Sequence, residues 1–244
     1  MGFITLNRHE ALNALSLEMV NELSRLLSIW KANSSIQAVA IRGSTKKGPF
    51  GNFCAGGDIR FFHMAGCSGD KQLDEFFTAE YRLNHLIFTY PKPYIAFLDG
   101  IVMGGGMGIS QGASLRIVTE RTKMAMPETN IGFFPDVGGG FFLSRCPDNL
   151  GEYLGLTGQA LIGNDALFAG LADHVVDSES LDQLWQNLSD SSIRSVDDRI
   201  SHLKSQLETQ PPVERWPKWW DDRINDVFAM NSIQDMVNSL TNMG

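Results

Sequence analysis

The sequence predicts an α/β fold from two junctions at which a short apolar run leads through glycines into a helix-compatible segment. Residues 94–98 (YIAFL) and 38–41 (AVAI) are apolar runs, each short enough for a buried strand. Glycines follow the first run at 104–106 and the second at 56–57. Glycine lets the backbone approach a ligand closely, and the first N–H groups of a helix have no partner within the helix.

Composition limits the classes of protein that the chain can belong to. Its 244 residues allow one or two domains, and 43% hydrophobic residues with 20% charged are ordinary for a globular protein. No apolar run reaches the ~18 residues of a membrane span, so no membrane partner is expected. The net charge of −8 argues against nucleic acid as a partner.

Cysteine and histidine content suggests a reducing compartment and no bound metal. Three cysteines do not form a paired framework, and five histidines show no metal-ligand spacing with one another or with cysteine. With no signal segment recognised, we expect a cytoplasmic protein without a metal or a separate cofactor. Residues 1–60 carry seven Lys/Arg and four acids, a local charge of +3 that would suit an anionic ligand, although scattered surface lysines would look the same.

The first elements are a strand over 3–6 and a helix over 17–31. Ser16 has the side chain of a helix N-cap, and the helix carries an apolar face. Residues 61–90 also show helical periodicity, and Glu80 lies within them. A lone helical glutamate is usually solvated. The pair of prolines at 91 and 93 ends this helical region and begins the strand over 94–98.

The glycines at 104–106 predict a helix over 107–115, and later patterns predict four more elements. Helices are expected over 139–145 and 164–170, a short strand close to 171–176, and amphipathic helix over 224–240. The polar stretch 177–198 reads as a linker or as an exposed helical layer. An aromatic cluster is expected at Trp216, Trp219 and Trp220.

Two backbone donors aimed at one point would suit acyl chemistry. A carbonyl oxygen that becomes negative during reaction is stabilised by such a pair, and a helix N-terminus adds partial positive charge. Two acids, Glu128 and Asp136, each follow a proline and lie close to this region in sequence. Both also have a structural interpretation, because aspartate before glycines can cap a helix and glutamate after proline favours a first turn.

Three motifs together resemble the crotonase superfamily of acyl-coenzyme A enzymes: FCAGGDIR (53–60), MGGGMG (103–108) and MPETNIGFFPDVGGG (126–140). Their order and spacing are most similar to the 3-hydroxyisobutyryl-CoA hydrolase branch. The resemblance implies a crotonase-like spiral of ββα units with a C-terminal helical layer. It divides the chain into an acyl-CoA-binding core over 1–176 and a helical region over 177–244, shorter than in other family members.

The resemblance also implies roles for particular residues. The amides of Gly57 and Gly105 would hold the thioester oxygen, Glu128 would be nucleophile or general base, and Asp136 would orient substrate or water. Glu80 would recognise the small hydroxyacyl part. The remaining substrate contacts would come from Arg8, Leu12 and Asp58.

Position 108 separates the possible reactions. Hydratases of the superfamily carry a glutamate there, whereas this chain has Gly108, which cannot move a proton. The resemblance therefore favours a thioester hydrolase of valine breakdown, with coenzyme A as part of the substrate and a homotrimer as the assembly. An enoyl-CoA hydratase or isomerase on the same fold, or an inactive acyl-CoA-binding protein, are the alternatives.

Overall fold

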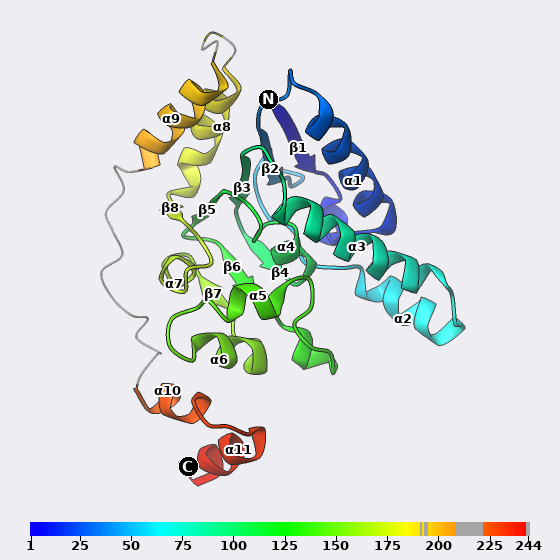
Figure 1. Ribbon diagram of the computed structural model, residues 1–244, viewed down its shortest axis with the longest axis vertical. Coiled ribbons are helices and arrows are strands. Elements are labelled where there is room, and N and C mark those ends of the chain that lie inside the picture. Colours follow the sequence, from blue (N-terminus) through cyan, green and yellow to red (C-terminus); the bar gives the residue numbers. More distant parts are fainter. Residues whose placement is uncertain (191, 193–194, 208–221, 243–244) are drawn as a thin grey trace.

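Five parallel strands form the central sheet of the computed structural model, which describes residues 1–190, 192, 195–207 and 222–242 (Figure 1). Their order is β1-β2-β3-β5-β8, and every neighbouring pair is parallel. Parallel neighbours require crossover connections, and helices supply most of them. The bounds are Gly2–Leu6 (β1), Val39–Gly43 (β2), Tyr94–Leu98 (β3), Leu115–Thr119 (β5) and His174–Val176 (β8).

A second, smaller sheet follows the carboxyl end of β3. Its order is β4-β6-β7, with a parallel β4/β6 pair and an antiparallel β6/β7 pair. The strands are Ile101–Met103 (β4), Lys123–Ala125 (β6) and Leu161–Ile162 (β7). Because only two residues separate the end of β3 from the start of β4, the chain passes directly from one sheet into the other.

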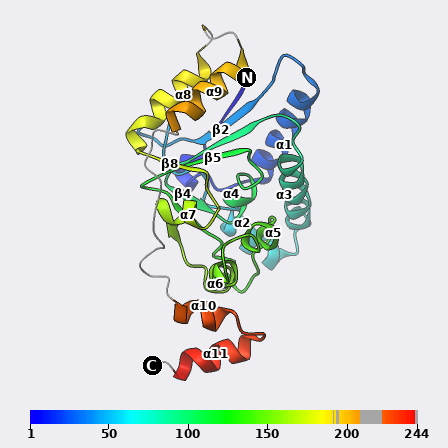
Figure 2. The same ribbon diagram turned by 60° about the vertical axis from the view of Figure 1, so that its left-hand side comes forward.

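Helices α1 (Leu17–Ala32) and α3 (Gln72–Phe88) cover one face of the central sheet (Figures 1 and 2). The Ser16 side chain accepts a hydrogen bond from the Met19 N–H and so caps α1 as predicted. Buried residues of both helices pack against alternate residues of β1, β2 and β3. Helix α2 (Ile59–Ser68) precedes α3 and contacts it through phenylalanine rings.

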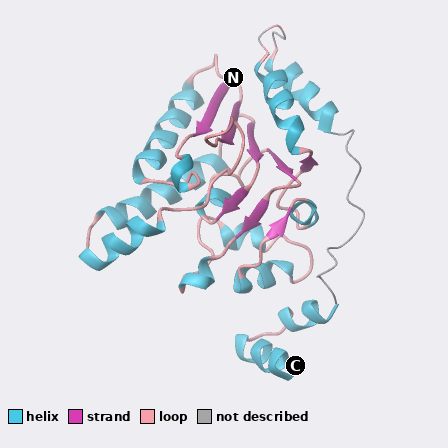
Figure 3. Cartoon of the chain, turned by 180° about the vertical axis from the view of Figure 1, so that it is seen from behind, coloured by secondary structure: helices cyan, strands magenta, loops and turns pink. Residues whose placement is uncertain are grey.

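Helices α8 (Leu181–Ser189) and α9 (Val196–Leu207) cover the opposite face (Figure 3). Trp185 of α8 lies edge-on to Phe97 of β3, with ring centroids 5.3 Å apart. The helical layer predicted after residue 177 is therefore present, but α8 is not exposed, because four of its apolar side chains are buried. The domain boundary placed at residue 176 stays a prediction.

Shorter elements complete the described chain. Helix α10 (Asp222–Phe228) contacts α6, and α11 (Ile233–Asn242) packs against α10 at the end of the molecule where the C-terminus is found (Figure 1). The cluster predicted at Trp216, Trp219 and Trp220 lies outside the described residues. The others are η1 (His9–Ala11), α4 (Gly105–Gly108), η2 (Glu128–Ile131), α5 (Gly139–Leu143), α6 (Leu150–Thr157), α7 (Asn164–Phe168) and η3 (Ser178–Ser180).

The predicted α/β class is confirmed, but one element is wrong. The helix expected over 107–115 is only the four-residue α4, and the chain then turns into β5, which was not predicted. Gly112 lies in the turn after α4, and a β-carbon there would lie 2.9 Å from the backbone of Phe88 in α3. In the described part of the chain, no helix is long and apolar enough to cross a membrane.

Candidate active site

The two glycine junctions lie side by side in the structure. Cys54 and Val102 form an isolated parallel bridge, in which the Cys54 N–H donates to Ile101 O at 2.9 Å and the Met103 N–H to Cys54 O at 3.0 Å. This pairing places Gly56 and Gly57 next to the start of α4. Segments that are almost fifty residues apart in sequence therefore meet at one place.

The backbone amides of Gly57 and Gly105 lie close to each other. A β-carbon built on Gly105 would lie 3.4 Å from the Gly57 nitrogen, and one built on Gly56 would lie 3.7 Å from the Gly105 nitrogen. Among the described residues, no carbonyl accepts a backbone hydrogen bond from either N–H. Both donors can therefore bind a ligand oxygen. Their role at a reacting carbonyl stays a prediction.

Glu80 and Glu128 reach this region from two different elements. Glu80 comes from α3, is 2% exposed, and its Oε1 would collide with a β-carbon on Gly105. Glu128 begins η2 directly after Pro127, is 8% exposed, and its Oε1 lies 2.7 Å from where a β-carbon on Gly104 would be. Neither Glu80 Oε1 nor Glu128 Oε2 has a hydrogen-bond partner within the described structure. Two buried carboxyl groups thus flank the pair of amides.

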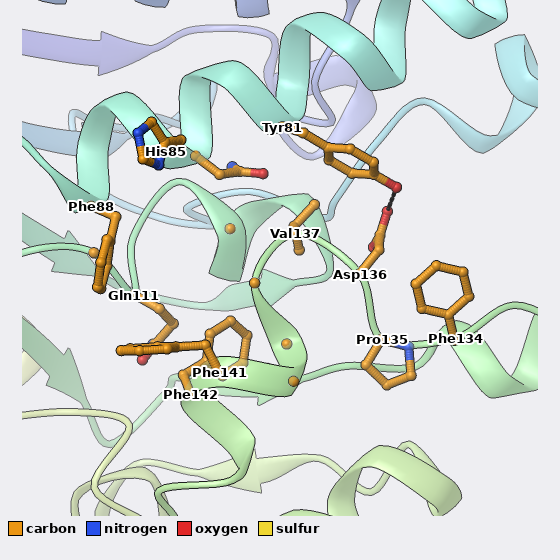
Figure 4. A pocket seen from close by; sticks show the side chains of 16 residues that line it. Tyr81, His85, Phe88, Gln111, Phe134, Pro135, Asp136, Val137, Phe141 and Phe142 are labelled. Carbon is orange, nitrogen blue, oxygen red and sulfur yellow. Dashed lines mark hydrogen bonds between the residues drawn. The ribbon is translucent and has the colours of Figure 1, made fainter.

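Asp136 joins this acid cluster from the loop between η2 and α5. The Tyr81 hydroxyl donates a hydrogen bond to Asp136 Oδ2 at 2.7 Å (Figure 4). Because Gly132 ends η2 in a left-handed conformation, Glu128 and Asp136 are separated by a turn, as predicted, and not by two turns of one helix. The charge of Asp136 raises the pKa of both Glu80 and Glu128, and the charge of Glu128 raises the pKa of Glu80. The three acids are therefore close enough to interact electrostatically.

Burial dominates the electrostatics of the acid cluster. Burial, together with the charges of Asp136 and Glu128, raises the pKa of Glu80 to about 8. Burial also raises the pKa of Glu128 to about 7, with a further contribution from the charge of Asp136. The pKa of Asp136 is raised by burial as well, but the hydrogen bond from Tyr81 opposes this rise. Glu80 and Glu128 therefore hold their protons to a higher pH than ordinary carboxyl groups do.

The raised pKa of Glu80 predicts that the protein becomes less stable as the pH rises. Between the ordinary value of 4.5 and about 8, the folded state keeps the proton that the unfolded state has released, so rising pH favours unfolding. We expect the free energy of unfolding to fall by roughly 2–5 kcal/mol across this window. Urea unfolding at several pH values measures the effect.

Glu80→Gln should reduce this pH dependence, because glutamine does not titrate, while the raised pKa of Glu128 leaves a smaller dependence in place. The matched control is Glu75→Gln, which makes the same change at an exposed position of α3. If the Glu80→Gln protein loses stability with rising pH as steeply as the unchanged protein, Glu80 does not hold the proton.

Arg8, Leu12 and Asp58, which were predicted to contact substrate, lie together in the structure. Arg8 and Asp58 form an ion pair with each other. The Arg8 guanidinium donates to Asp58 Oδ2 at 2.6 Å and to Ala14 O at 3.0 Å. Asp58 also caps α2 by accepting a hydrogen bond from the Phe61 N–H. Leu12 is 44% exposed, and its carbonyl accepts from the Ala55 N–H. These contacts fasten the loop to the first glycine junction, while contact of these residues with substrate stays a prediction.

Tyr81 is a site residue that the sequence did not reveal. It follows Glu80 on α3, but its partner Asp136 is 55 residues away, and helical periodicity carries no signal for such a contact.

Tyr81→Phe should raise the pKa of Asp136. Without the donated hydrogen bond, the carboxylate of Asp136 is less stable and its pKa rises. We expect a rise of about half to one pH unit, measured by NMR titration of the side-chain carboxyl groups. Tyr90→Phe is the control, since Tyr90 donates its hydroxyl to Leu27 O at 2.9 Å and not to an acid. An unchanged titration of Asp136 in the Tyr81→Phe protein would contradict this role.

Gly108 and Val137 are in tight contact behind Asp136. A β-carbon on Gly108 would lie 2.6 Å from the β-carbon of Val137 and 2.8 Å from Asn84 Nδ2. Val137 is buried and has a φ of 42°, which is unusual for a β-branched residue. Such local strain persists only where the surrounding packing imposes it. The space beside Gly108 is therefore occupied by Val137 and the Asn84 amide.

Comparison with known proteins places these features in context. A family model described as enoyl-CoA hydratase/isomerase matches residues 1–244. The 3-hydroxyisobutyryl-CoA hydrolase, mitochondrial, of Xenopus tropicalis is 44% identical over 98% of this chain and 62% of its own length. The protein of the same name from Gallus gallus is 40% identical over 100% of this chain and 63% of its own length. The chain thus spans less than two thirds of these relatives.

Solved structures show the same fold. A carnitinyl-CoA dehydratase from Mycobacterium thermoresistibile superposes with a TM-score of 0.85 at 36% identity, covering 98% of this chain and 67% of the other. The predicted crotonase-like fold is confirmed by this match. The cytoplasmic location expected from the sequence is wrong, because the relatives above are mitochondrial by name. Unpaired cysteines report on redox conditions and do not specify a compartment.

Proposed function

The chain belongs to the enoyl-CoA hydratase/isomerase family, and we propose that it is an acyl-CoA thioester hydrolase of the 3-hydroxyisobutyryl-CoA type. The observation that carries the proposal is the convergence of two unpartnered amides, Gly57 and Gly105, with the buried acids Glu80 and Glu128. Relatives 40–44% identical over nearly all of this chain bear the name of that hydrolase. Because this similarity extends over nearly the whole chain, it supports the same class of reaction for this protein.

In the proposed mechanism, the thioester oxygen accepts hydrogen bonds from the Gly57 and Gly105 amides. Glu128 either attacks the carbonyl carbon itself or removes a proton from an attacking water. The carbon–sulfur bond then breaks, and coenzyme A leaves as a thiol after taking up a proton. Water supplies the hydroxyl of the released acid, so that no oxidant, metal or separate cofactor takes part.

The proposed roles depend on which acid holds a proton. Glu128 must be ionised to act as nucleophile or base, and a pKa of about 7 leaves it partly ionised near neutral pH. Asp136, which accepts a hydrogen bond from Tyr81, is placed to orient water or to pass a proton. Glu80, with a pKa of about 8, remains protonated and can donate a hydrogen bond to the hydroxyacyl group. Glu128 and Asp136 would titrate as a pair.

Gly108 distinguishes this proposal from hydration. Addition of water to a double bond needs a second proton-transfer group near the acyl chain, and neither Gly108 nor the packed Val137 can transfer a proton. Some structural relatives are hydratases by name. One is an enoyl-CoA hydratase from Rhodobacter sphaeroides, which superposes with a TM-score of 0.72 at 31% identity and covers 97% of this chain and 70% of its own. Hydratase activity is therefore the competing proposal.

The biological setting is proposed from the relatives. We infer a mitochondrial protein of valine breakdown, since the matched hydrolases are mitochondrial by name. Assembly as a homotrimer is likewise proposed. Exposed apolar side chains on α11, among them Val237 and Leu240, are available for subunit or intrachain contacts.

Release of free thiol from acyl-CoA substrates tests the proposed function. The panel contains 3-hydroxyisobutyryl-CoA, 3-hydroxypropionyl-CoA and crotonyl-CoA, and both thiol and loss of the double bond are followed. Thiol release from the hydroxyacyl substrates supports the hydrolase. Water addition to crotonyl-CoA without thiol release would support the hydratase instead. Binding without either reaction would indicate an inactive acyl-CoA-binding protein.

A further inference from the structure

The side chain of Asn13 is buried in the loop between β1 and α1, where it bonds to the backbone of two other segments. It is 0% exposed, and its Nδ2 donates to Ser44 O at 3.1 Å and to Asn52 O at 2.7 Å. Its Oδ1 accepts from the Arg8 N–H at 2.8 Å. Asn13 has a φ of 57°, in the left-handed region that asparagine enters more readily than most residues. A buried amide that uses both donor hydrogens and its oxygen holds its surroundings in one arrangement.

The residues that follow Asn13 pair with the segment that contains Gly57. Leu15 and Gly57 form an isolated parallel bridge. In this bridge the Leu15 N–H donates to Gly56 O at 2.7 Å, and the Asp58 N–H donates to Leu15 O at 3.1 Å. Leu15 is 0% exposed, which protects these hydrogen bonds from competing water. Gly57 is thus held on both sides by one residue, two positions after Asn13.

The hydrogen bond from Leu15 sets the direction of the Gly57 N–H. The Gly56–Gly57 peptide bond is trans, so the Gly56 carbonyl and the Gly57 N–H lie in one plane and point in opposite directions. Because the carbonyl is directed toward the Leu15 N–H, the Gly57 N–H is directed away from Leu15. A displacement of Leu15 would therefore turn the donor that the proposed function assigns to the thioester oxygen.

Asn52 continues this connection to the second glycine junction. Its backbone carbonyl accepts from Asn13, and its Oδ1 accepts from the Ile101 N–H at 3.1 Å. Ile101 begins β4, the strand that leads to Gly105. Gly100 has a φ of 58° and lies against Asn52, since a β-carbon there would be 2.6 Å from Asn52 Oδ1. The side chains of Asn13 and Asn52, which we call the asparagine clamp, thus connect the loop before α1 with both segments that carry the amides.

We propose that Asn13 and Asn52 are positioning residues for thioester hydrolysis. They hold the amides of Gly57 and Gly105 in place for the thioester oxygen. This inference rests on the proposed function, because it concerns the oxyanion donors of the same site. Such a donor accelerates the reaction when it is already held where the negative charge develops. A loosened asparagine clamp should therefore slow the chemical step, while the part of the ligand that lies away from the carbonyl still binds.

Asn13→Gly tests the asparagine clamp, because glycine adopts a φ of 57° without strain and lacks the side-chain amide. We expect kcat for thiol release from the best substrate to fall about tenfold or more, while outright removal of a donor costs about 10²–10³-fold. Calorimetry with an S-alkyl thioether analogue of acyl-CoA, in which a methylene replaces the carbonyl, should show an affinity within a few-fold of the unchanged protein. An unchanged kcat, or an equal loss of kcat and of thioether affinity, would overturn the proposal.

Ser44→Ala is the matched control for lost stability. It removes a buried hydroxyl that donates to Leu6 O at 2.9 Å, but it keeps the backbone carbonyl that accepts from Asn13. Thermal unfolding should show that both variants are less stable than the unchanged protein. At a temperature where both are folded, kcat should fall only in Asn13→Gly. An equal fall of kcat in Ser44→Ala would make the effect one of stability and overturn the positioning role.

Asn52→Asp and Asn52→Leu form a second test, which does not depend on the folding of Asn13→Gly. Aspartate keeps an oxygen that can accept from the Ile101 N–H, whereas leucine has a similar size and no acceptor. Asn52→Leu should lower kcat about tenfold, the usual worth of one hydrogen bond, and Asn52→Asp should retain most of the activity that Asn52→Leu loses. Asn52 is only partly buried, so both variants are expected to fold. Equal rates for the two proteins would overturn the role of Asn52.

Infrared spectroscopy of a bound thioester tests the amides without turnover. The Glu128→Gln protein should hold an acyl-CoA with an isotopically labelled carbonyl, and hydrogen bonds from the two amides should lower the stretching frequency of that carbonyl. Adding Asn13→Gly should remove about half of this lowering, because one of two donors is misaligned, whereas adding Ser44→Ala should not change it.

Failure of the asparagine clamp is distinguishable from failure of the proposed function. A lowered carbonyl frequency that Asn13→Gly leaves unchanged defeats only the clamp. Absence of both the lowered frequency and thiol release from any acyl-CoA in the unchanged protein defeats the hydrolase, and the clamp with it.

Discussion

Glu128→Gln is expected to lower the rate of thiol release from acyl-CoA by about 10²–10⁴-fold, the usual contribution of a general base. Glutamine is close in shape to glutamate but can neither attack the carbonyl nor accept a proton from water. The carboxyl group is held against Gly104 and is 8% exposed, so that solvent water cannot easily replace it. Steady-state kinetics measure the effect.

Binding should survive this substitution, because Glu128 takes part mainly in the chemical step. Calorimetry with a thioether analogue is expected to give an affinity within a few-fold of the unchanged protein. Glu152→Gln serves as control, since it makes the same change at an exposed position of α6. Normal turnover by the Glu128→Gln protein would remove Glu128 from the mechanism.

Gly105→Val should lower kcat/KM for thiol release by about 10²–10³-fold or more, comparable to the loss of one oxyanion donor. The new β-carbon would collide with Glu80 Oε1, lie 3.2 Å from Leu15 Cδ1 and lie 3.4 Å from the Gly57 nitrogen. It would thus occupy the space between the Gly57 amide and the Glu80 carboxyl group. Overpacking is expected to cost about 1–3 kcal/mol of unfolding free energy as well.

Two comparisons separate blocking of the site from loss of folding. Gly48→Val makes the same change where no atom lies within 4 Å of the new β-carbon, and it should leave activity unchanged. Circular dichroism and thermal unfolding of Gly105→Val should show a folded protein. A folded Gly105→Val protein with normal kcat/KM would disprove the assignment of the two amides.

Strands buried on both faces could be predicted well from the sequence. The strand expected over 94–98 is β3 with the same bounds, because Tyr94, Ala96 and Leu98 face α1 and α3 while Ile95 and Phe97 face α8. Burial on both sides produces a continuous apolar run. By contrast, β5 contains Arg116, whose guanidinium pairs with Asp173, 57 residues later. No local pattern indicates that a charged residue of this kind belongs to a strand.

The roles of Glu80, Glu128 and Asp136 were predicted from the resemblance, since the sequence alone favours a solvated glutamate at position 80. The structure shows why Glu80 is buried. Glu80 falls four residues after Phe76 and three before Leu83, and both are buried. Helical spacing therefore places this acid on the inner face of α3. The contact between Tyr81 and Asp136 depends on how α3 packs against a loop 55 residues away.

The contact between Gly108 and Val137 restricts how this protein could acquire a different reaction. With 2.6 Å between a β-carbon at 108 and that of Val137, a glutamate at 108 cannot be accommodated while valine remains at 137. Replacing Val137 with glycine would remove the clash with the valine and the unfavourable φ of 42°, and would leave the Asn84 amide, 2.8 Å from the new β-carbon, to move aside. A glutamate at position 108 is therefore expected only together with, or after, a smaller residue at position 137.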